Sequence, residues 1–396
     1  MSIDLVETVC DLVRLPSVNP MGRDVRGEAY YEHRVTAYLQ QLFERLRLPW
    51  QRVPTAPLRD NIAARLDGDV PPEQGGPIIM LEAHQDTVPV DGMTIPPWTP
   101  EIRDGRIYGR GACDIKGGMA CMLATVARLC VERPAGRPTI VIACAVNEEY
   151  GGAGAPDLAQ LWQAGPGSLL PRPPDAVIVA EPTELDVVVA HKGTVRWCCH
   201  TGGRAAHSSQ PQTGDNAIYR MARVVAALEK YAREIAPQLA EHPLVGRPTL
   251  SVGMIRGGIS VNTVPDRCTV EIDRRLAPGE DSDTALAHIR DFLASELGAE
   301  AQVTHDPPYL SMTPLADDLN RDLANRLSHT IRGCGQAGRC LGVPYGTDAP
   351  AFAAQGLPTV VFGPGALAQA HTKDEWVAID QLQAATEILY QFCRKA

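Results

Sequence analysis

The amino-acid sequence predicts an α/β fold, because short apolar runs alternate with helical patterns along much of the chain. A helical pattern in 117–130 lies between the first two of four runs that are typical of buried strands. These runs are 77–83 (PIIMLEA), 139–147 (TIVIACAVN), 175–181 (DAVIVAE) and 357–365 (LPTVVFGPG). Such alternation predicts a largely parallel central sheet that is covered by helices.

A segment of different character interrupts this pattern. Residues 192–306 have the order strand, helix, strand, strand, helix, strand, which is that of a ferredoxin-like (βαββαβ) unit. Its first helix, in 216–235, carries apolar residues every three or four positions, an Asp or Ser caps the second helix, and its last strand is expected in 299–308. The sequence therefore predicts one domain made of 1–191 and 307–396, into which 192–306 is inserted.

Composition and charge narrow the function classes. The chain has 396 residues, which is more than one ordinary domain, and its net charge of −10 argues against a nucleic-acid partner or an anionic membrane. No run approaches the ~20 apolar residues of a membrane span, and the N-terminal segment does not resemble a secretion signal. The eleven cysteines, without a C-x-x-C pair, are expected to be reduced thiols of a cytoplasmic protein.

Ionisable side chains follow all four predicted strands, at or shortly after the point where each strand ends. They are His84 and Asp86 after the first strand, Glu148 and Glu149 after the second, Glu181 at the end of the third, His371 after the last, and Asp114 in a glycine-rich turn before a helix. Taken singly, such a histidine is more often a structural residue and such an acid is usually solvated. Ligands of open α/β sheets bind outside the carboxyl ends of the strands, so the coincidence predicts one shared site.

The residue types in this set indicate a metal site. Two histidines with several carboxylates and no cysteine suit zinc, cobalt or manganese, and Cys113 is expected to be a small core residue. The acids are too many for one tetrahedral ion, which predicts two divalent ions, most simply zinc, that share a carboxylate. Asp86 is placed to accept the second ring N–H of His84. Of Glu148 and Glu149, one acid can bind metal while the other accepts a proton from water.

Seven motifs in order along the chain resemble the acetylornithine deacetylase, succinyl-diaminopimelate desuccinylase and aminoacylase family of dinuclear zinc amidohydrolases and peptidases. They are HQDTVPV, GRGACDIKGG, NEEYGG, AEPT, AHSSQP, GGISVNTVPD and GPGALAQAHTKDEWV. The resemblance implies a zinc-peptidase-like catalytic domain and an inserted lid and dimerisation domain. It also implies a cis peptide bond after Asp114.

The resemblance assigns roles at the metal centre. One zinc ion would be bound by His84, Asp114 and Glu181. The other would be bound by Asp114, Glu149 and His371. Asp86 would orient the histidine, and Glu148 would be the general base.

The resemblance also implies groups that bind the substrate. His207 resembles the histidine that completes a neighbouring subunit's site, which predicts a homodimer through the lid. Asn262, Arg275, Gly346 and Thr347 resemble the groups that hold the substrate carboxylate.

From the residues alone, some of these assignments stay open. His207 could be a loop histidine, and Asn262 could be a turn residue. Strand alternation puts only one of Arg274 and Arg275 on the site face, and we prefer Arg275 for its spacing to the turn at 278–279.

Three further histidines and the apolar residues of the lid complete the predictions about single residues. His191, His200 and His305 are expected to be structural. The apolar positions of the lid, including Val195 and Trp197, are more than one face of a small sheet needs, which favours the dimer.

The predicted reaction is hydrolysis of the amide bond of a small N-acyl amino acid. A dipeptidase or carboxypeptidase would use the same residues with a different pocket, and a binding protein without activity is the third alternative. The acyl group and the amino acid stay open, although Glu181 in place of Asp leans toward desuccinylase or aminoacylase relatives.

Overall fold

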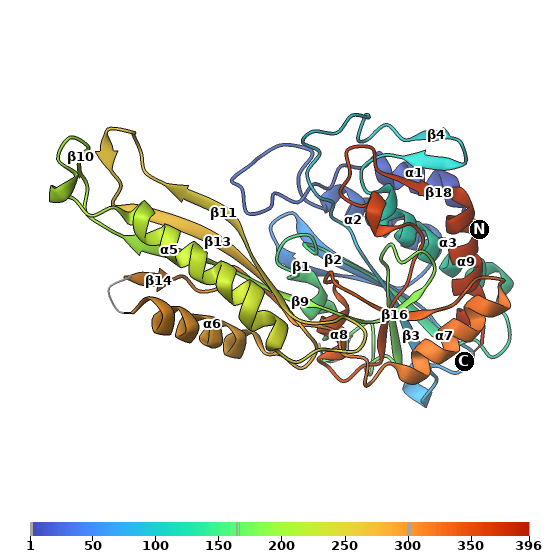
Figure 1. Ribbon diagram of the computed structural model, residues 1–396. Coiled ribbons are helices and arrows are strands. Elements are labelled where there is room, and N and C mark those ends of the chain that lie inside the picture. Colours follow the sequence, from blue (N-terminus) through green and yellow to red (C-terminus); the bar gives the residue numbers. More distant parts are fainter. Residues whose placement is uncertain (1–2, 164, 166, 299–301, 396) are drawn as a thin grey trace. The chain divides into compact units, whose positions relative to one another are not determined.

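The computed structural model describes residues 3–163, 165, 167–298 and 302–395 (Figure 1). The chain forms two compact units. The main unit consists of Met1–Val189, Ala316–Leu341 and Thr347–Ala396, and the insert unit consists of Ala190–Leu315 and Gly342–Gly346. In the part of the chain that is described, no helix has the length and apolar character needed to cross a membrane.

A mixed sheet of eight strands forms the centre of the main unit, in the order β1-β2-β6-β3-β7-β17-β8-β16. Strands β6, β3, β7 and β17 are parallel neighbours, whereas β1, β2 and β8 pair antiparallel. Their bounds are β1 Trp50–Ala56, β2 Arg59–Leu66, β3 Ile78–His84, β6 Thr139–Ala145, β7 Ala176–Val179, β8 Val187–His191, β16 Cys340–Val343 and β17 Thr359–Val361. The predicted α/β class with a largely parallel central sheet is confirmed.

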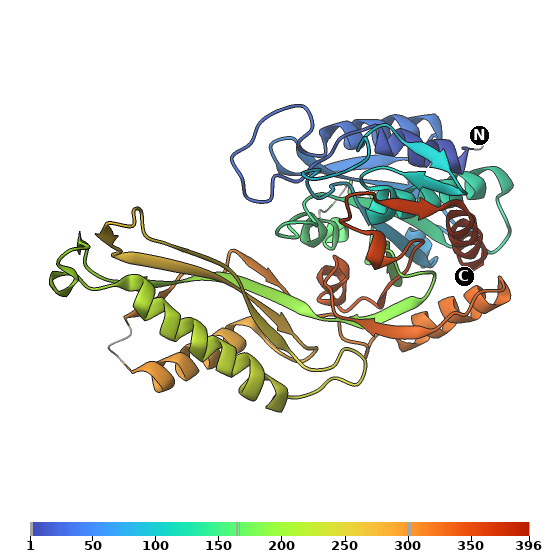
Figure 2. The same cartoon turned by 45° about the horizontal axis from the view of Figure 1, so that its top comes forward.

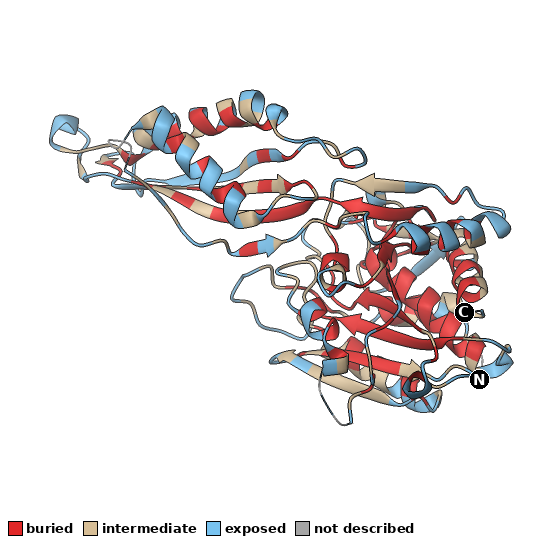
Figure 3. Ribbon diagram, turned by 90° about the horizontal axis from the view of Figure 1, so that it is seen from below, coloured by how far each residue is buried: buried red, intermediate tan, exposed pale blue. Residues whose placement is uncertain are grey.

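The central strands are buried along their whole length, which explains why they are apolar on both faces (Figure 3). Five helices share one hydrophobic cluster with the sheet, and two short helices pack against it outside that cluster. The five are α1 Leu5–Val13, α2 His33–Arg45, α3 Gly117–Glu132, α7 Arg321–Gly333 and α9 Ile379–Cys393, and the two are α4 Gly154–Leu158 and α8 Ala349–Ala353.

A small antiparallel sheet in the main unit joins the C-terminal segment to the segment before α3. Its order is β18-β5-β4, and Trp376 in β18 lies opposite Tyr108 in β5. The strands are β4 Glu101–Arg103, β5 Arg106–Tyr108 and β18 Trp376–Ala378. This pairing fixes where the residues just before β18 lie.

The insert unit contains an antiparallel sheet in the order β11-β13-β9-β14, with two helices along one face (Figure 2). This is the strand order of the predicted ferredoxin-like arrangement. The elements are β9 Gly193–Gly202, α5 Ala217–Lys230, β11 Thr249–Gly257, β13 Arg267–Leu276, α6 Ser282–Leu297 and β14 Val303–His305. Asp281 caps α6 by accepting the N–H of Thr284, as predicted. Residues 299–301 of the predicted last strand lie outside the described residues.

Three short strands add to this unit. Strand β15 (Leu310–Met312) also pairs with β9, so the compact insert unit extends to Leu315. Strand β10 (Ala206–His207) pairs with β12 (Thr263–Val264) in a ladder of its own.

The core of the insert unit changes one of the arguments made from sequence. Val195 and Trp197 are fully buried between the sheet and the helices, together with Met221, Leu228 and Ile289. The expected surplus of apolar residues over the needs of one sheet face is wrong for these two positions, because the two predicted helices cover that face and bury both side chains. These two residues therefore do not support a subunit interface.

Candidate metal centre

The carboxyl ends of three neighbouring parallel strands gather most of the predicted ligands. His84 is the last residue of β3 and lies opposite Ala145, the last residue of β6. Glu148 and Glu149 follow β6 after a short connection, and Glu181 follows the end of β7. Parallel pairing thus places these ends at one edge of the sheet, where ligands of such sheets bind.

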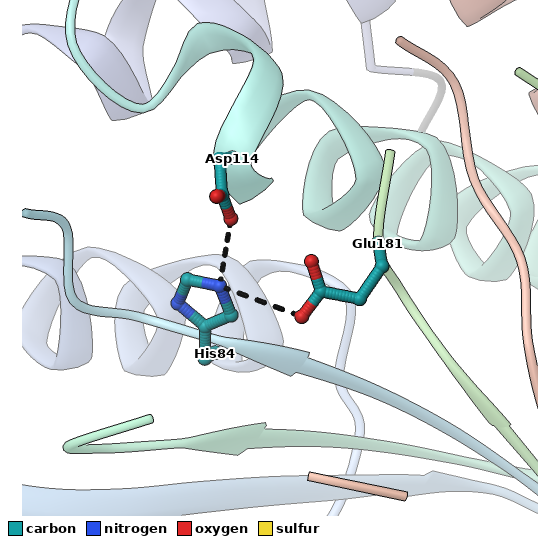
Figure 4. Close-up of side chains that lie close together, drawn as sticks. All are labelled: His84, Asp114 and Glu181. Atoms are coloured by element: carbon teal, nitrogen blue, oxygen red, sulfur yellow. Dashed lines mark hydrogen bonds and ion pairs between the residues drawn. The ribbon is translucent and has the colours of Figure 1, made fainter. Parts of the chain in front are cut away.

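His84, Asp114 and Glu181 form a first buried triad (Figure 4). The Nε2 atom of His84 lies 3.1 Å from Asp114 Oδ1 and 3.9 Å from Glu181 Oε1. One ligand atom from each residue lies within 4.8 Å of the others. The three donor atoms therefore converge closely enough to hold one ion.

A second triad consists of Asp114, Glu149 and His371. Here too, one ligand atom from each residue lies within 4.8 Å of the others. His371 Nε2 lies 3.1 Å from Asp114 Oδ2 and 3.1 Å from Glu149 Oε2. Asp114 thus belongs to both triads and turns a different oxygen atom toward each histidine.

The turn that carries Asp114, Ala112–Lys116, has little space around it. A Cβ atom on Gly117 would lie 2.5 Å from the carbonyl oxygen of Ala112, so glycine is needed where α3 begins directly after this turn. The peptide bond between Asp114 and Ile115 is cis, which confirms the prediction.

Asp86 has more contacts than the sequence suggested. The Nδ1 atom of His84 lies 3.0 Å from the main-chain oxygen of Asp86 and 3.5 Å from its carboxylate Oδ1, so the carbonyl is the nearer partner of the ring. The Asp86 carboxylate accepts the peptide N–H groups of Glu148 at 3.1 Å and of Glu149 at 3.2 Å. It also accepts the side-chain N–H of Asn19 at 2.7 Å. Asp86 therefore fixes the backbone of both glutamates, and Asn19 is a site residue for which the sequence carries no signal.

The charges of the site are unbalanced. Burial raises the pKa of Glu148 and of Glu181 well above the usual range, and the neighbouring carboxylates raise both further. Burial and the charge of Asp114 raise the pKa of Glu149 to about 6. For His371, burial is outweighed by Asp114 and Glu149, which raise its pKa to about 11. Two histidines cannot offset so many buried carboxylates, so the donor set fits two divalent cations.

Cys113, next to Asp114, is a buried thiol. Its Sγ lies 3.5 Å from the carbonyl oxygen of Ala366, and burial raises its pKa well above the usual value. A thiol in this state packs as a small core residue and is a poor nucleophile.

In the insert unit, the fold brings His207 and Asn262 together. His207 lies opposite Thr263 in the β10/β12 ladder, and the N–H of Ser208 donates to the carbonyl oxygen of Asn262 at 3.0 Å. The Nδ1 atom of His207 accepts the N–H of Ser209 at 3.2 Å. In the neutral ring, Nε2 then carries the proton and can donate a hydrogen bond.

Arg274 and Arg275 lie on opposite faces of β13. Arg274 is buried on the face that the helices cover and donates to Glu280 at 2.7 Å. Arg275 is half-buried on the helix-free face, where it donates to Asp273 at 2.8 Å and to Thr194 Oγ1 at 2.9 Å. The two guanidinium groups therefore lie on opposite faces of the sheet, and that of Arg275 is the more exposed one.

The predicted pair Gly346 and Thr347 lies where the chain leaves the insert unit for the main unit. Thr347 is buried, and its hydroxyl accepts the N–H of Ala349 at the start of α8. The Cβ position of Gly346 has no neighbour closer than 3.5 Å, so a small side chain would fit there without a clash.

The three histidines expected to be structural have partners elsewhere. His191 Nδ1 donates to the carbonyl of Lys192 at 3.0 Å, and His305 Nδ1 accepts from Trp197 at 3.1 Å. His200 contacts Asp306 at 2.8 Å. None of the three belongs to the two described triads.

Comparison with known proteins gives a consistent result. Residues 80–395 match Peptidase family M20/M25/M40. An acetylornithine deacetylase from Myxococcus xanthus is 32% identical over 327 residues, which cover 80% of this chain and 79% of that protein. A probable succinyl-diaminopimelate desuccinylase from Staphylococcus aureus (strain MSSA476) is 26% identical over 408 residues, with 95% and 93% covered.

Solved structures share the fold. A metallo-carboxypeptidase of the M20 family from Sulfolobus solfataricus is similar with a TM-score of 0.78 and 17% identity, over 99% of each chain. The family match covers more than half of the chain, and the deacetylase is similar over most of its length. This chain belongs to Peptidase family M20/M25/M40.

Proposed function

We propose that the chain hydrolyses the amide bond of a small N-acyl amino acid at a centre of two divalent metal ions. The observation that carries the proposal is the position of Asp114, whose two oxygens lie 3.1 Å from His84 and 3.1 Å from His371. A carboxylate so placed can bridge two ions. We assign one ion to His84, Asp114 and Glu181, and the other to Asp114, Glu149 and His371.

When bound, the two ions would polarise the acyl carbonyl and lower the pKa of a water molecule toward 7. Glu148 belongs to neither triad, and we assign it the role of general base. It would accept a proton from the attacking water and give it to the leaving amine. Asp86 supports this role, because it accepts the peptide N–H of Glu148 and so fixes the backbone that carries the base.

We assign the substrate contacts to the insert unit and the segment that follows it. The Nε2–H of His207 would donate to the oxyanion that forms when water attacks. Arg275 and Asn262 would hold the carboxylate of the amino acid together with Gly346 and Thr347. The position of Arg275 on the open face of its sheet supports this choice over Arg274.

The substrate class rests on the names of the relatives. Two of the similar relatives are named acetylornithine deacetylase and probable succinyl-diaminopimelate desuccinylase, and both names describe removal of an acyl group from an amino acid. A dipeptidase or carboxypeptidase reaction is the alternative, since the family is one of peptidases. A binding protein without activity is not favoured, because the chain has a suitable residue at every position that the reaction needs.

Zinc is the metal we propose, because histidine and carboxylate ligands suit it, and cobalt or manganese could take its place. We further propose a cytoplasmic protein. All eleven cysteines are free, which suits a reducing compartment.

A homodimer through the insert unit completes the proposal. Strand β11 lies at the edge of its sheet. Met254 and Ile255 in this strand are exposed, and Ile259 and Val261 in the loop after it are 92% and 99% exposed. Exposed apolar residues beside an unpaired strand edge are typical of an interface, and a second copy of the chain would cover the same surface by two-fold symmetry.

The test of the proposed reaction is a panel of N-acetyl, N-succinyl and longer N-acyl amino acids together with dipeptides, assayed after loading with zinc, cobalt or manganese. We expect the highest kcat/KM on one class of acyl-amino acid. Turnover of dipeptides alone would favour the peptidase alternative, and no turnover by protein that binds two ions would contradict both.

A further inference from the structure

Glu375 is a fully buried carboxylate that the predicted reaction does not use. Its Oε2 atom accepts from Arg110 Nη1 at 2.7 Å and from the N–H of Gly111 at 3.0 Å. Its Oε1 atom accepts from the N–H of Cys113 at 2.8 Å and of Asp114 at 3.0 Å. Each oxygen thus receives two hydrogen bonds, and one of the donors is the peptide group of the residue shared by the two triads.

Glu375 also belongs to the segment that carries His371. Its own carbonyl oxygen accepts the N–H of Gly109 at 3.0 Å, and strand β18, which begins at the next residue, pairs with β5. The carbonyl of Lys373 accepts the N–H of Thr94 at 2.8 Å. The segment after His371 is therefore bound at several points to the segment that leads into the Asp114 turn.

The chemistry of this contact requires a carboxylate. The peptide N–H groups of Gly111, Cys113 and Asp114 point toward one place, where only an acceptor with two oxygens can accept from them and from the arginine together. Burying such a group is costly unless it is paired, and Arg110, itself buried, supplies the opposite charge. A residue with these contacts is held in one position, and it holds the turn in return.

We infer that Glu375 is a positioning residue that sets Asp114 and His371 relative to each other, and so keeps the ligands of the second ion aligned. The inference rests on the proposed two-ion function. This positioning role differs from a general structural role, because the Glu375 carboxylate accepts the peptide N–H of the ligand Asp114 and Glu375 follows the ligand His371 by four residues. Groups that orient metal ligands typically change metal affinity by about 10–100-fold when they are replaced.

The test replaces Glu375 by glutamine, which keeps the size of the side chain. Its single amide oxygen can accept only part of the four hydrogen bonds, and its NH₂ group would face two donors. Metal-free protein is titrated with Co²⁺ and followed by calorimetry and by the visible absorption of the bound ion. We expect wild type to bind two ions, and E375Q to bind one of them about 10–100-fold more weakly with an altered spectrum.

Two further variants separate positioning from folding. Asp175→Asn removes a carboxylate that accepts the N–H of Ile78 at 2.7 Å and pairs with Arg172, at the opposite end of β3 from His84. It should lower the melting temperature and leave the affinity for both ions unchanged. Glu375→Asp keeps the charge and replaces E375Q in the test if E375Q does not fold. It too should weaken the binding of one ion, because its shorter side chain cannot reach the turn without shifting it.

A cycle with His371→Ala identifies the ion concerned. If Glu375 acts by aligning His371 and Asp114, E375Q should lower the affinity for the second ion much less in the His371→Ala variant than in wild type. Wild type that binds two ions while both Glu375 variants bind them with unchanged affinity and spectrum would overturn the inference. Wild type that does not bind two ions would instead overturn the proposed function.

Discussion

Asp114 Oδ2 and His371 Nε2 lie 3.1 Å apart, although the residues come from either side of the inserted unit in the sequence. Asp114 Oδ1 lies at the same distance from His84 Nε2. One carboxylate thus joins two groups of ligands, and the consequences can be tested at each of them.

Removal of metal should abolish activity. Prolonged chelation of the purified protein takes away both ions, and the buried carboxylates then lack the cations that offset their charge. Activity should return with zinc, cobalt or manganese and not with magnesium, which binds histidine poorly. Protein that stays fully active after its metal content is shown to be zero would contradict the two-ion centre.

The two adjacent glutamates should give different phenotypes. Glu148→Gln removes the proposed proton acceptor and no ligand, so kcat should fall by a factor of about 10²–10⁴ while two ions stay bound. Glu149→Gln removes a ligand and should release one ion. The measurements are kcat and metal content per chain for each variant. The assignment of the pair is wrong if the two phenotypes are exchanged.

His207→Ala should lower kcat by roughly 10²–10³, the usual loss for one oxyanion donor. Subunit mixing tells whether the histidine acts on its own subunit or on its partner. Chains with His207→Ala are combined with chains with Glu148→Gln, each nearly inactive alone. A heterodimer has one site with an intact base and an intact histidine from the partner, so activity should reappear. Isolated heterodimers that stay inactive would show that His207 acts within its own chain.

Arg275→Gln should raise KM more than it lowers kcat, because the guanidinium is proposed to hold a carboxylate that does not react. Arg196→Gln is the matched control. Arg196 also pairs with Asp273, at 2.7 Å, in the same sheet. Steady-state kinetics of both variants on the best substrate of the panel decides the assignment. Equal effects of the two substitutions on KM would show that general charge on this face matters and that Arg275 has no special role.

Stability should fall in mild acid partly because of His191. Burial lowers its pKa to about 4, whereas in the unfolded chain the pKa is about 6.5. Between these values the unfolded chain binds the proton and the folded chain does not, so stability present above pH ~6.5 is lost as the pH falls toward 4, by at most about 3 kcal/mol.

His191→Asn keeps a donor for the carbonyl of Lys192 and removes the titrating group. The difference in the urea midpoint between wild type and this variant, measured at pH 7 and pH 4.5, should therefore shift in favour of the variant at the lower pH. Acid groups elsewhere contribute equally to both proteins and cancel. A difference that does not change with pH would exclude His191 as a source of acid sensitivity.

Much of the candidate site could be predicted from local patterns. His84, Glu149 and Glu181 each follow an apolar run, and the ends of parallel strands meet at one edge of a sheet whatever the details of packing. The order of strands and helices in the insert unit is likewise predicted by the spacing of apolar residues, which recur every two positions in the strands and every three to four in the helices. These signals depend on neighbouring residues, and the sequence contains them in full.

The sequence by itself thus determined the fold class, the insertion and the residue types of two candidate metal sites. Only the tertiary structure decided that the Asp86 carboxylate accepts the peptide groups of Glu148 and Glu149, that Trp197 is fully buried in the core of the insert unit, and that Glu375 holds the Asp114 turn. Strand ends and helical periods arise from contacts between residues close in sequence. The partner of a buried carboxylate is chosen by the packing of segments far apart, since any N–H brought within reach can satisfy it.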